Sequence, residues 1–475
     1  MLTLALSWES LVVRVYALSF LLNLATIPVV LLAPKTPQGK LGWILILLGA
    51  PGVGLLLYWI AGRSRLKRRV VLLRHGRASY VEATERPHRE AVARQLGSGF
   101  SPGLVRTAEV MGAFPPYPAN ELLVLADGPS ARAAMLEAID GAKDHVHVET
   151  YIIRADRTGE AIVAALARAA GRRVEVRLLY DSWGSHGIPS HLFRPLLRAG
   201  GHVAAFLPVG LLRPGLRINL RNHRKVVLVD GHTAFTGGMN VADEYMDANR
   251  WRDAHVRIRG PAALGLQRVF LEDWQFATDE RVADERYFRG GLPRGEIPVQ
   301  VVAGGPDRET SQVEDLFFAA IAAARLRVDI VTPYFLPPEP LMAAVRAVVL
   351  RGLPVRLLIP AMTDHRVVRL AMEGTLPRLM GAGLEVWGYP RMIHGKILVV
   401  DDEWGTLGSA NMDSRSLRLN FELNVAFPHP PTAVALRELV DREIAQSRRL
   451  GPEDFRFGLG GRLLRNAAGL LAPVL

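Results

Sequence analysis

Two stretches of the sequence carry the same five residue types at the same spacing. Each residue of the first set recurs 171 positions later in the second: His223, Lys225, Asp230, Gly237 and Asn240 correspond to His394, Lys396, Asp401, Gly408 and Asn411. An imidazole beside an ammonium group supplies a nucleophile or proton donor next to a cation that can bind an anion. The repetition predicts one active site assembled from two copies of one motif.

Residues two apart on a β-strand face the same way, so His223 and Lys225 project together, as do His394 and Lys396. Displacement at phosphorus needs an attacking group on one side and a proton donor for the leaving oxygen on the other. Two lysines can stabilise the negative charge of the phosphoryl oxygens. We therefore expect phosphoryl-transfer chemistry with no metal and no other cofactor, since His-x-Lys is also poor metal-ligand spacing.

The remaining motif residues have different predicted tasks. Asp230 and Asp401 follow their histidines by seven positions, at or beyond the strand end. They are included in the predicted catalytic set, although this odd offset favours an ion pair or a turn contact over direct chemistry. Asn240 and Asn411 follow glycine-rich segments, where the backbone can approach a ligand closely, and we expect them to contact the phosphate.

The N-terminal region predicts a transmembrane hairpin over residues 1–63. Residues 15–34 and 41–62 contain no charged side chain, and each is long enough to cross the hydrocarbon core of a bilayer. A cleaved signal peptide is the alternative for the first stretch, but residues 1–10 contain no Lys or Arg. Whether the first span crosses fully stays open, because Arg14 and Pro28 weaken it. Five basic residues within 63–69 predict that residues 63–475, including both motifs, lie on the cytoplasmic side of the membrane.

The composition narrows the class of protein. A chain of 475 residues is too long for one ordinary core, which favours two domains or one duplicated domain. The net charge of +12 suits a polyanion, and for a chain anchored in a bilayer we expect acidic phospholipid rather than nucleic acid. The absence of cysteine excludes disulfides, thiolate catalysis and cysteine-based zinc sites.

A strand–helix–strand pattern occurs twice and predicts the elements that position the motifs. It covers residues 145–153, 159–171 and 174–182, and again 328–336, 340–352 and 355–361. This alternation predicts a mostly parallel sheet, covered on both faces and built twice. The predicted organisation is a connector at 64–120, a first half at 121–290 (motif 217–244), a second half at 291–450 (motif 388–415) and a tail at 451–475. The tail is either a helix docked on the core or an interfacial membrane helix.

The paired His-x-Lys-x4-Asp motifs resemble those of the phospholipase D superfamily. Further blocks at 251–262, 332–337 and 408–425, together with the hairpin, are similar to those of bacterial cardiolipin synthases. The resemblance implies duplicated α-β-α sandwich halves around a pseudo-two-fold active site. It also implies phosphatidyl transfer between two phosphatidylglycerol molecules through a phosphohistidine. By this analogy His223 is the nucleophile and His394 the acid/base, and the reverse assignment stays open.

The resemblance further implies that an acidic residue orients a catalytic imidazole. Asp253 lies 30 residues after His223, and Glu422 lies 28 after His394, so both are candidates. The alternative is that they are surface acids. Tyr151 and Tyr334, near corresponding strand ends, either line the mouth of the pocket or belong to the core.

Four other functions compete with cardiolipin synthesis. A phospholipase D hydrolase, or a transphosphatidylase with another donor or acceptor, would use the same motif chemistry. A nuclease of the same superfamily would have no need of two spans, and the sequence shows no basic groove studded with aromatic residues. A non-catalytic lipid-binding protein would have no reason to keep ten motif positions chemically intact.

Overall fold

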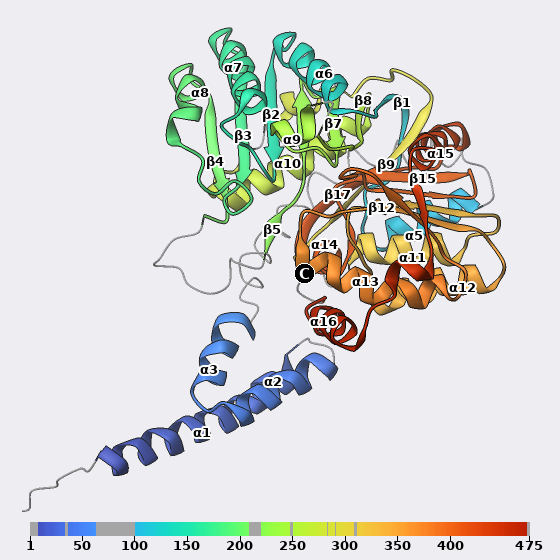
Figure 1. Cartoon of the computed structure of the whole chain (residues 1–475). Helices are drawn as coiled ribbons and strands as arrows, with labels where there is room; N and C mark the ends of the chain where they lie inside the picture. The colour runs from blue at the N-terminus through green and yellow to red at the C-terminus, as the bar shows by residue number, and fades with distance from the viewer. Residues whose placement is uncertain are drawn as a thin grey trace, which may run out of the picture. The chain divides into compact units, whose positions relative to one another are not determined.

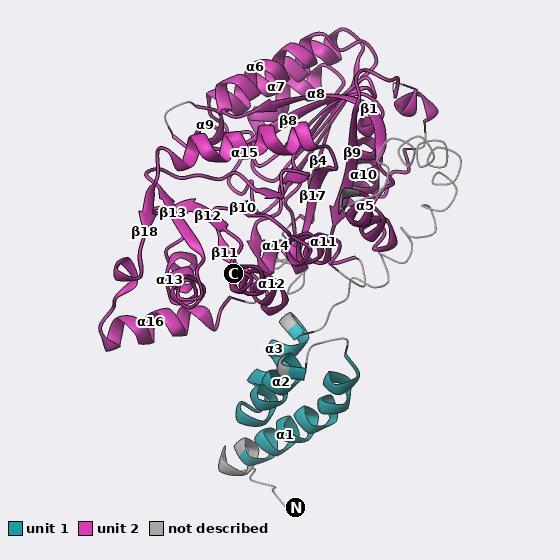
Figure 2. Ribbon diagram, turned by 90° about the vertical axis from the view of Figure 1, so that its right-hand side faces the viewer, with its two compact units in different colours: residues 1–72, 209–219 teal, residues 73–208, 220–475 magenta. Residues whose placement is uncertain are grey.

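The computed structural model of the chain describes residues 8–33, 37–62, 100–208, 220–247, 250–282, 284–289, 291–307 and 311–472. The chain forms two compact units (Figure 2). One comprises residues 1–72 and 209–219, and the other comprises residues 73–208 and 220–475. The predicted connector at 64–120 lies outside the described residues up to position 99.

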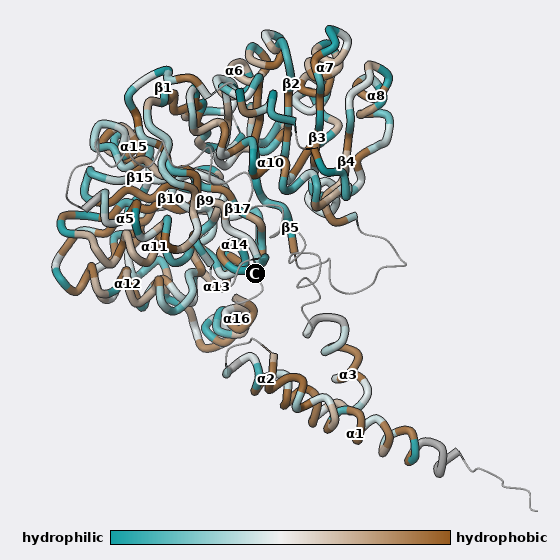
Figure 3. Tube along the Cα trace, turned by 180° about the vertical axis from the view of Figure 1, so that it is seen from behind, coloured by the Kyte–Doolittle hydropathy of each residue, from teal (hydrophilic) through white to brown (hydrophobic). Residues whose placement is uncertain are grey.

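The smaller unit contains the apolar N-terminal segments. Helix α1 (Trp8–Leu32) runs without interruption through Pro28, and α2 (Pro37–Gly49) packs against it. The Asn23 side chain donates a hydrogen bond of 2.6 Å to the Leu47 carbonyl, which satisfies a polar group among apolar residues. Among the described residues one helical stretch, 13–32, is long and apolar enough to cross a membrane (Figure 3).

The predicted second span over 41–62 is wrong as a continuous helix. Helix α2 ends at Gly49, and the chain resumes as α3 (Val53–Leu57) followed by a π-helical turn (Tyr58–Gly62). Pro51 cannot donate a backbone hydrogen bond, and Gly52 has a φ of +80°, which favours glycine. These two residues divide the apolar stretch into pieces shorter than a bilayer core.

Among the described residues, the larger unit is built on one continuous sheet of sixteen strands. Figure 1 shows the strands of both halves with the helices around them. The strands of the first half are β1 (Tyr117–Leu125), β2 (His145–Thr150), β3 (Glu175–Asp181), β4 (His202–Phe206), β5 (Arg221–Asn222), β6 (Val226–Val229), β7 (Thr233–Gly237) and β8 (His255–Arg259). Those of the second half are β9 (Ile297–Gly304), β10 (Val328–Val331), β12 (Val355–Pro360), β13 (Glu385–Tyr389), β14 (Ile397–Val400), β15 (Trp404–Gly408), β17 (Asn420–Phe427) and β18 (Arg448–Leu450). Two short strands, β11 (Phe335–Leu336) and β16 (Met412–Asp413), pair separately.

The strand order shows the predicted duplication. It runs β18-β13-β12-β10-β14-β15-β17-β9 and continues β1-β8-β7-β6-β2-β3-β4, with β9 and β1 antiparallel at the junction. Read outward from that junction, the seven strands from β9 to β13 correspond in order to the seven from β1 to β4, and β18 and β5 stand outside this correspondence. The motif strands β6 and β14 therefore occupy equivalent positions.

The prediction of a mostly parallel sheet is wrong. Only the outer strands β2-β3-β4 and β10-β12-β13 run parallel within each half. The motif strand is instead the first arm of an antiparallel hairpin, β6-β7 in one half and β14-β15 in the other. Short turns connect these arms, and a parallel pair would need a much longer crossover.

Helices cover both faces of the sheet, as predicted. They are α6 (Gly128–Asp140), α7 (Arg157–Gly171), α8 (Arg194–Arg198), α9 (Asp243–Met246) and α10 (Ala262–Thr278), then α11 (Gln312–Ala322), α12 (Glu339–Leu350), α13 (Arg366–Met380), α14 (Ser414–Arg418), α15 (Pro430–Ile444) and α16 (Leu459–Gly469). Alternation along β2 shows the two faces. Val146 and Val148 belong to an apolar core with α6 and α7, whereas His147, on the opposite face, bonds Gln267 of α10.

The described end of the predicted connector belongs to the folded core. Helix α5 (Phe100–Val110) packs against α11, and Leu104 and Ala108 are buried in the core of the second half. Strand β1 then begins at Tyr117, before the predicted boundary at 121. Helix α5 ends at Val110, before Pro115, and the described part of the segment is not a linker.

Candidate active site

The two motifs enter the sheet at equivalent places. His223 and Lys225 precede β6, and His394 and Lys396 precede β14, so the histidine and lysine lie at the start of an apolar strand. All four side chains are buried. The hydrophobic strand fixes the backbone behind them by its register with β2 or β10.

Each motif is also held by the backbone of the other half. The N–H of His223 donates to the Phe421 carbonyl at 2.9 Å, and the N–H of His394 donates to the Arg252 carbonyl at 2.6 Å. The chain before His223 extends this contact, because β5 pairs in parallel with β17. The site is therefore assembled at the junction between the halves.

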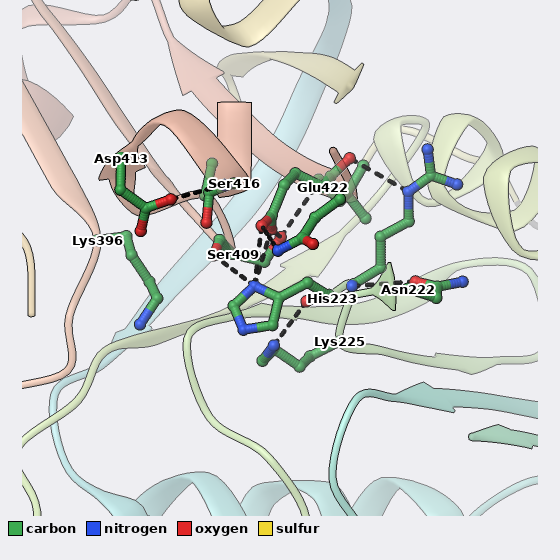
Figure 4. A network of polar contacts seen from close by, with 12 residues as sticks. Asn222, His223, Lys225, Lys396, Ser409, Asp413, Ser416 and Glu422 are labelled. Atoms are coloured by element: carbon green, nitrogen blue, oxygen red, sulfur yellow. Dashed lines mark hydrogen bonds and ion pairs between the residues drawn. The ribbon is translucent and has the colours of Figure 1, made fainter. Parts of the chain in front are cut away.

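Each imidazole meets a carboxylate from the opposite half. Nδ1 of His223 lies 3.0 Å from the Glu422 carboxylate, and Nδ1 of His394 lies 2.7 Å from Oδ2 of Asp253. Figure 4 shows Glu422 directed at the His223 ring, with Lys225 and Lys396 nearby. Both acids are buried, so neither is a surface acid. A carboxylate at Nδ1 selects the tautomer that leaves the Nε2 lone pair available.

The two lysines are held next to the histidines. Nζ of Lys225 donates to the His223 carbonyl at 2.5 Å, and Nζ of Lys396 donates to the His394 carbonyl at 2.5 Å and lies 3.0 Å from Nε2 of that ring. Burial lowers the pKa of Lys225 to about 7 and that of Lys396 to about 8. Ammonium groups that are poorly solvated bind an incoming anion strongly.

Burial also sets the protonation of the imidazoles and their partners. It lowers the pKa of His223 to about 4, against the opposing effect of Glu422. Burial and the nearby lysines hold the pKa of His394 well below its ordinary value. Burial raises the pKa of Asp253 to about 6, whereas His223 and Lys225 outweigh burial at Glu422 and lower its pKa. Both rings are thus neutral near pH 7, as a nucleophile must be.

The two motif aspartates lie away from this chemistry. Asp230 accepts backbone N–H bonds from residues 143–145, and Asp401 accepts them from residues 325–327, at 2.7 to 3.2 Å. Both adopt a left-handed φ, of +52° and +58°. They fasten the turn after each motif strand to the start of β2 or β10. This is the turn contact that the offset of seven residues from each histidine favoured. Neither carboxylate lies at the reacting groups, so the structure corrects the inclusion of Asp230 and Asp401 in the predicted catalytic set.

The two asparagines differ in position. Asn411 lines the cavity described below, whereas Asn240 is buried and its Oδ1 accepts the Ile152 N–H at 3.1 Å. The cavity lining does not include Asn240. The structure therefore brings Asn411 to the site and gives Asn240 a contact with the backbone after β2.

One cavity contains both histidines. It has a volume of about 460 Å³ and is lined by Tyr151, Arg154, Trp183, His186, Arg221, His223, Glu244, Tyr245, Trp251, Tyr334, Asp364, His365, Val368, His394, Asn411, Asp413 and Arg415, with a few neighbours. Tyr151 and Tyr334 are in this lining. The Tyr151 ring lies 4.9 Å from the His223 ring, and the Tyr334 hydroxyl donates to Asp364 at 2.6 Å.

Several residues at the site were missed by the sequence reasoning. The Ser409 hydroxyl donates to Glu422 at 2.5 Å, so it holds the carboxylate that holds His223. Ser409 stands within the repeated motif, and its counterpart 171 residues earlier is Gly238. A Cβ atom at Gly238 would lie 2.1 Å from Oδ1 of Asp253, so a side chain there would displace the second carboxylate. Comparing the two motifs position by position was the signal that could have found this difference.

Arg224 connects the halves behind the site. It lies between His223 and Lys225, is buried and is not among the residues that line the cavity. Its guanidinium pairs with Asp273 and donates to the carbonyls of Gly304 and Glu422 at 2.9 and 3.1 Å. The bond to the Glu422 backbone helps to place that carboxylate. The second motif has Gly395 at this position, so it has no arginine equivalent to Arg224.

A duplicated α/β fold with two buried His-Lys pairs, whose histidines line one cavity, is the arrangement of a phospholipase D-type phosphoryl transferase. The family described as "Cardiolipin synthase, PLD-like domain" matches residues 135–274 and 317–444, and a family described as "Phospholipase_D-nuclease N-terminal" matches residues 21–63. Among curated relatives, a cardiolipin synthase of Geobacillus kaustophilus is 34% identical over 88% of this chain and 85% of its own length. A cardiolipin synthase 2 of Bacillus cereus is 34% identical over 94% of this chain and 89% of its own.

A solved structure supports the fold alone. The phosphatidylserine synthase of Haemophilus influenzae matches with a TM-score of 0.59 and 16% identity, over 78% of this chain and all of that one. Together, the family match and the relatives show that this chain belongs to the bacterial cardiolipin synthases of the phospholipase D superfamily. It is a phosphatidyltransferase, an enzyme that acts on phospholipids.

Proposed function

We propose that the enzyme transfers a phosphatidyl group from one phosphatidylglycerol molecule to another, giving cardiolipin and glycerol. The observation that carries this proposal is the pair of buried imidazoles in one cavity, each with a carboxylate of the opposite half at Nδ1. On one side of a phosphodiester a neutral imidazole supplies the nucleophile, and on the other an imidazole that gains a proton on Nε2 supplies the acid/base. The match to cardiolipin synthases supports the choice of lipid.

In the first step Nε2 of His223 attacks the phosphorus of the donor. A nitrogen–phosphorus bond forms, the bond from phosphorus to the glycerol oxygen breaks, and His394 gives its proton to that oxygen. The phosphodiester anion offsets the positive charges of Lys225 and Lys396 that depress the pKa of His394, so substrate binding favours the protonated form of His394. The same lysines stabilise the charge on the non-bridging oxygens.

In the second step His394 acts as the base. It takes the proton from a hydroxyl of the acceptor phosphatidylglycerol, whose oxygen attacks the phosphorus as the bond to His223 breaks. His223 is then neutral again and His394 carries the proton that it gave up in the first step, as in the substrate-bound enzyme before transfer. Glu422 and Asp253 keep each Nδ1 protonated, so that Nε2 faces the phosphorus throughout.

The acceptor brings a second phosphate into the cavity. Two arginines, Arg221 and Arg415, line it, one from each half. The Arg221 side chain is oriented by Trp183, whose ring lies 4.9 Å from the guanidinium carbon. We assign the phosphate of the acceptor to these two arginines, since the two lysines are engaged by the donor.

We also propose that α1 anchors the enzyme in the bacterial cell membrane, with the larger unit on the cytoplasmic side. The length and apolar character of α1 support the anchor, and the basic residues at 63–69 support the orientation. The substrate would then be present in the bilayer that holds the enzyme.

Product analysis tests the reaction. Purified enzyme is incubated with phosphatidylglycerol as the only lipid, without added metal, and the lipids are resolved by mass spectrometry. Cardiolipin with an equal amount of glycerol is expected, and His223→Ala and His394→Ala should each abolish it. Phosphatidic acid without cardiolipin would make the enzyme a hydrolase. Full turnover in either variant would exclude the two-histidine mechanism.

A further inference from the structure

Helix α16 carries a stripe of exposed leucines near the C-terminus. Five leucines of this helix and of the turn that follows it are between 48% and 81% exposed: Leu459, Leu463, Leu464, Leu470 and Leu471. At about 100° per residue they fall within about 140° of the helix circumference. Isolated exposed leucines are ordinary, but a contiguous apolar stripe marks an interaction surface.

The rest of the helix circumference has other tasks. Ala468 is buried in the core of the second half, and Arg465 forms an ion pair of 2.6 Å with Glu373 of α13. A third side presents Arg462 and Asn466 to solvent. The helix is thus docked by one side, polar on another and apolar on the third. Docking fixes the direction in which the leucines point, so the two predictions for the tail are not exclusive.

Helix α13 relates the leucine stripe to the active site. It packs against α16, which crosses it in Figure 2, and Val368 near its N-terminus lines the cavity, as does His365 just before it. Met362 and Val367, beside these lining residues, are 68% and 42% exposed. Apolar side chains therefore occur both on α16 and at the end of α13 that borders the cavity.

We propose that α16 is an interfacial helix that lies on the lipid bilayer, with its leucines at the boundary of headgroups and acyl chains. Three observations favour a membrane over a protein partner. The same chain carries a helix able to span a bilayer, its family acts on phospholipids, and Arg462 beside the stripe suits anionic headgroups. Through α13, this contact would hold the cavity at the surface from which a lipid headgroup enters.

The cysteine-free chain allows a direct test in the full-length protein. Leu464→Cys and, as the matched control on the polar side of the same helix, Asn466→Cys are labelled with an environment-sensitive fluorophore. Each protein is reconstituted into vesicles of phosphatidylglycerol and phosphatidylethanolamine. The label at 464 is expected to be quenched by lipids with a spin label on the acyl chain and protected from aqueous iodide. The label at 466 is expected to show the reverse.

Two outcomes would overturn the proposal. Equal access of iodide to both labels would place the leucines in water. Protection of the 464 label from both quenchers would mean that protein, such as a second copy of the chain, covers the stripe. Neither depends on cardiolipin formation, so failure of this proposal is distinct from failure of the proposed reaction.

A kinetic measurement extends the test. The triple variant Leu463→Ser, Leu464→Ser, Leu470→Ser is expected to lower the rate on vesicles several-fold relative to the rate on monomeric short-chain phosphatidylglycerol. The control Asn466→Ser is expected to leave this ratio unchanged. An unchanged ratio in the triple variant would contradict a role of the stripe at the bilayer.

Discussion

Oδ2 of Asp253 lies 2.7 Å from Nδ1 of His394, although the two residues belong to opposite halves of the duplicated chain. The pair formed by Glu422 and His223 repeats the arrangement in the other direction. Neither half therefore contains both members of a motif histidine and its carboxylate. Each half thus supplies the carboxylate for the histidine of the other, which is an exchange of carboxylates between the halves. The exchange explains why the enzyme is built as two copies on one continuous sheet, since separating the halves would leave both imidazoles without the group that orients them.

The exchange predicts which variants will behave alike. A phosphatidyl donor with a nitrophenolate leaving group needs no proton on departure, so it requires only the nucleophile. With this donor, His394→Ala and Asp253→Asn are expected to form the phosphohistidine and release a stoichiometric burst of nitrophenol. His223→Ala should give no burst, and Glu422→Gln should slow it by about 10²–10⁴-fold. Rapid-quench measurement of nitrophenol and of the protein-bound phosphatidyl group checks this.

The same experiment identifies the nucleophile. If the burst survives in His223→Ala and Glu422→Gln but fails in the other two variants, the roles of the histidines are reversed. If Glu422→Gln instead gives the same full burst of nitrophenol as His394→Ala, the carboxylate that each histidine receives from the opposite half does not act in catalysis.

The pH dependence is expected to have an alkaline limit set by the lysines. Their pKa values are lowered to about 7 for Lys225 and about 8 for Lys396, so the charged ammonium exists below these values and is lost as the pH rises through them. We expect kcat/KM to fall by at least about tenfold per pH unit above this range. A profile of kcat, which reports the substrate-bound enzyme, should have its limit at higher pH, because the bound phosphate raises both pKa values. A flat kcat/KM profile up to pH 10 would contradict the assignment.

The position equivalent to Ser409 cannot accept a side chain in the first half. Gly238→Ala is expected to displace Asp253, because the new Cβ would lie 2.1 Å from its Oδ1. Turnover of phosphatidylglycerol should fall by about tenfold or more, while the burst with the nitrophenolate donor persists. Gly171→Ala is the matched control, since no atom lies within 4 Å of a Cβ there. Equal activity of the two variants would show that Asp253 tolerates displacement.

Asp401 is expected to affect stability rather than chemistry. Asp401→Ala removes three hydrogen bonds that a buried carboxylate accepts from backbone N–H groups and should lower the free energy of unfolding by about 2–4 kcal/mol. Denaturant titration measures this loss, and the activity per folded molecule should be retained. Asp401→Asn, which keeps an acceptor and tolerates the left-handed backbone, should cost less. Lost turnover at unchanged stability would return Asp401 to the catalytic set.

Arg415 is expected to influence the acceptor more than the donor. Arg415→Gln removes a charge assigned to the acceptor phosphate, so transfer to phosphatidylglycerol should fall by about tenfold relative to transfer to a neutral alcohol such as ethanol. The ratio of cardiolipin to phosphatidylethanol, formed in the presence of both acceptors, measures the effect. A ratio equal to that of the unmodified enzyme would place the acceptor phosphate elsewhere.

Much of the enzyme was predictable from residue types and spacing. The repeat of His223 and Lys225 as His394 and Lys396 implied one site assembled from two copies of a motif. A strand places alternate residues on one face whatever the rest of the fold, so each histidine and its lysine were expected to project together. Apolar runs predicted the helix α1 and the core strands because hydrophobicity and period are local properties. The apolar run over 41–62 did not predict the structure correctly. It is long enough for a membrane span, but Pro51 and Gly52 interrupt the helix.

Only the tertiary structure decided how the two copies complete one another. Sequence distance could not assign Asp253 to His394 or Glu422 to His223, because these contacts cross 141 and 199 residues of chain. They follow from the antiparallel junction of β1 and β9, which joins the two half-sheets into one. Local pattern determined which groups could react, and the joining of two half-sheets determined which carboxylate each histidine meets.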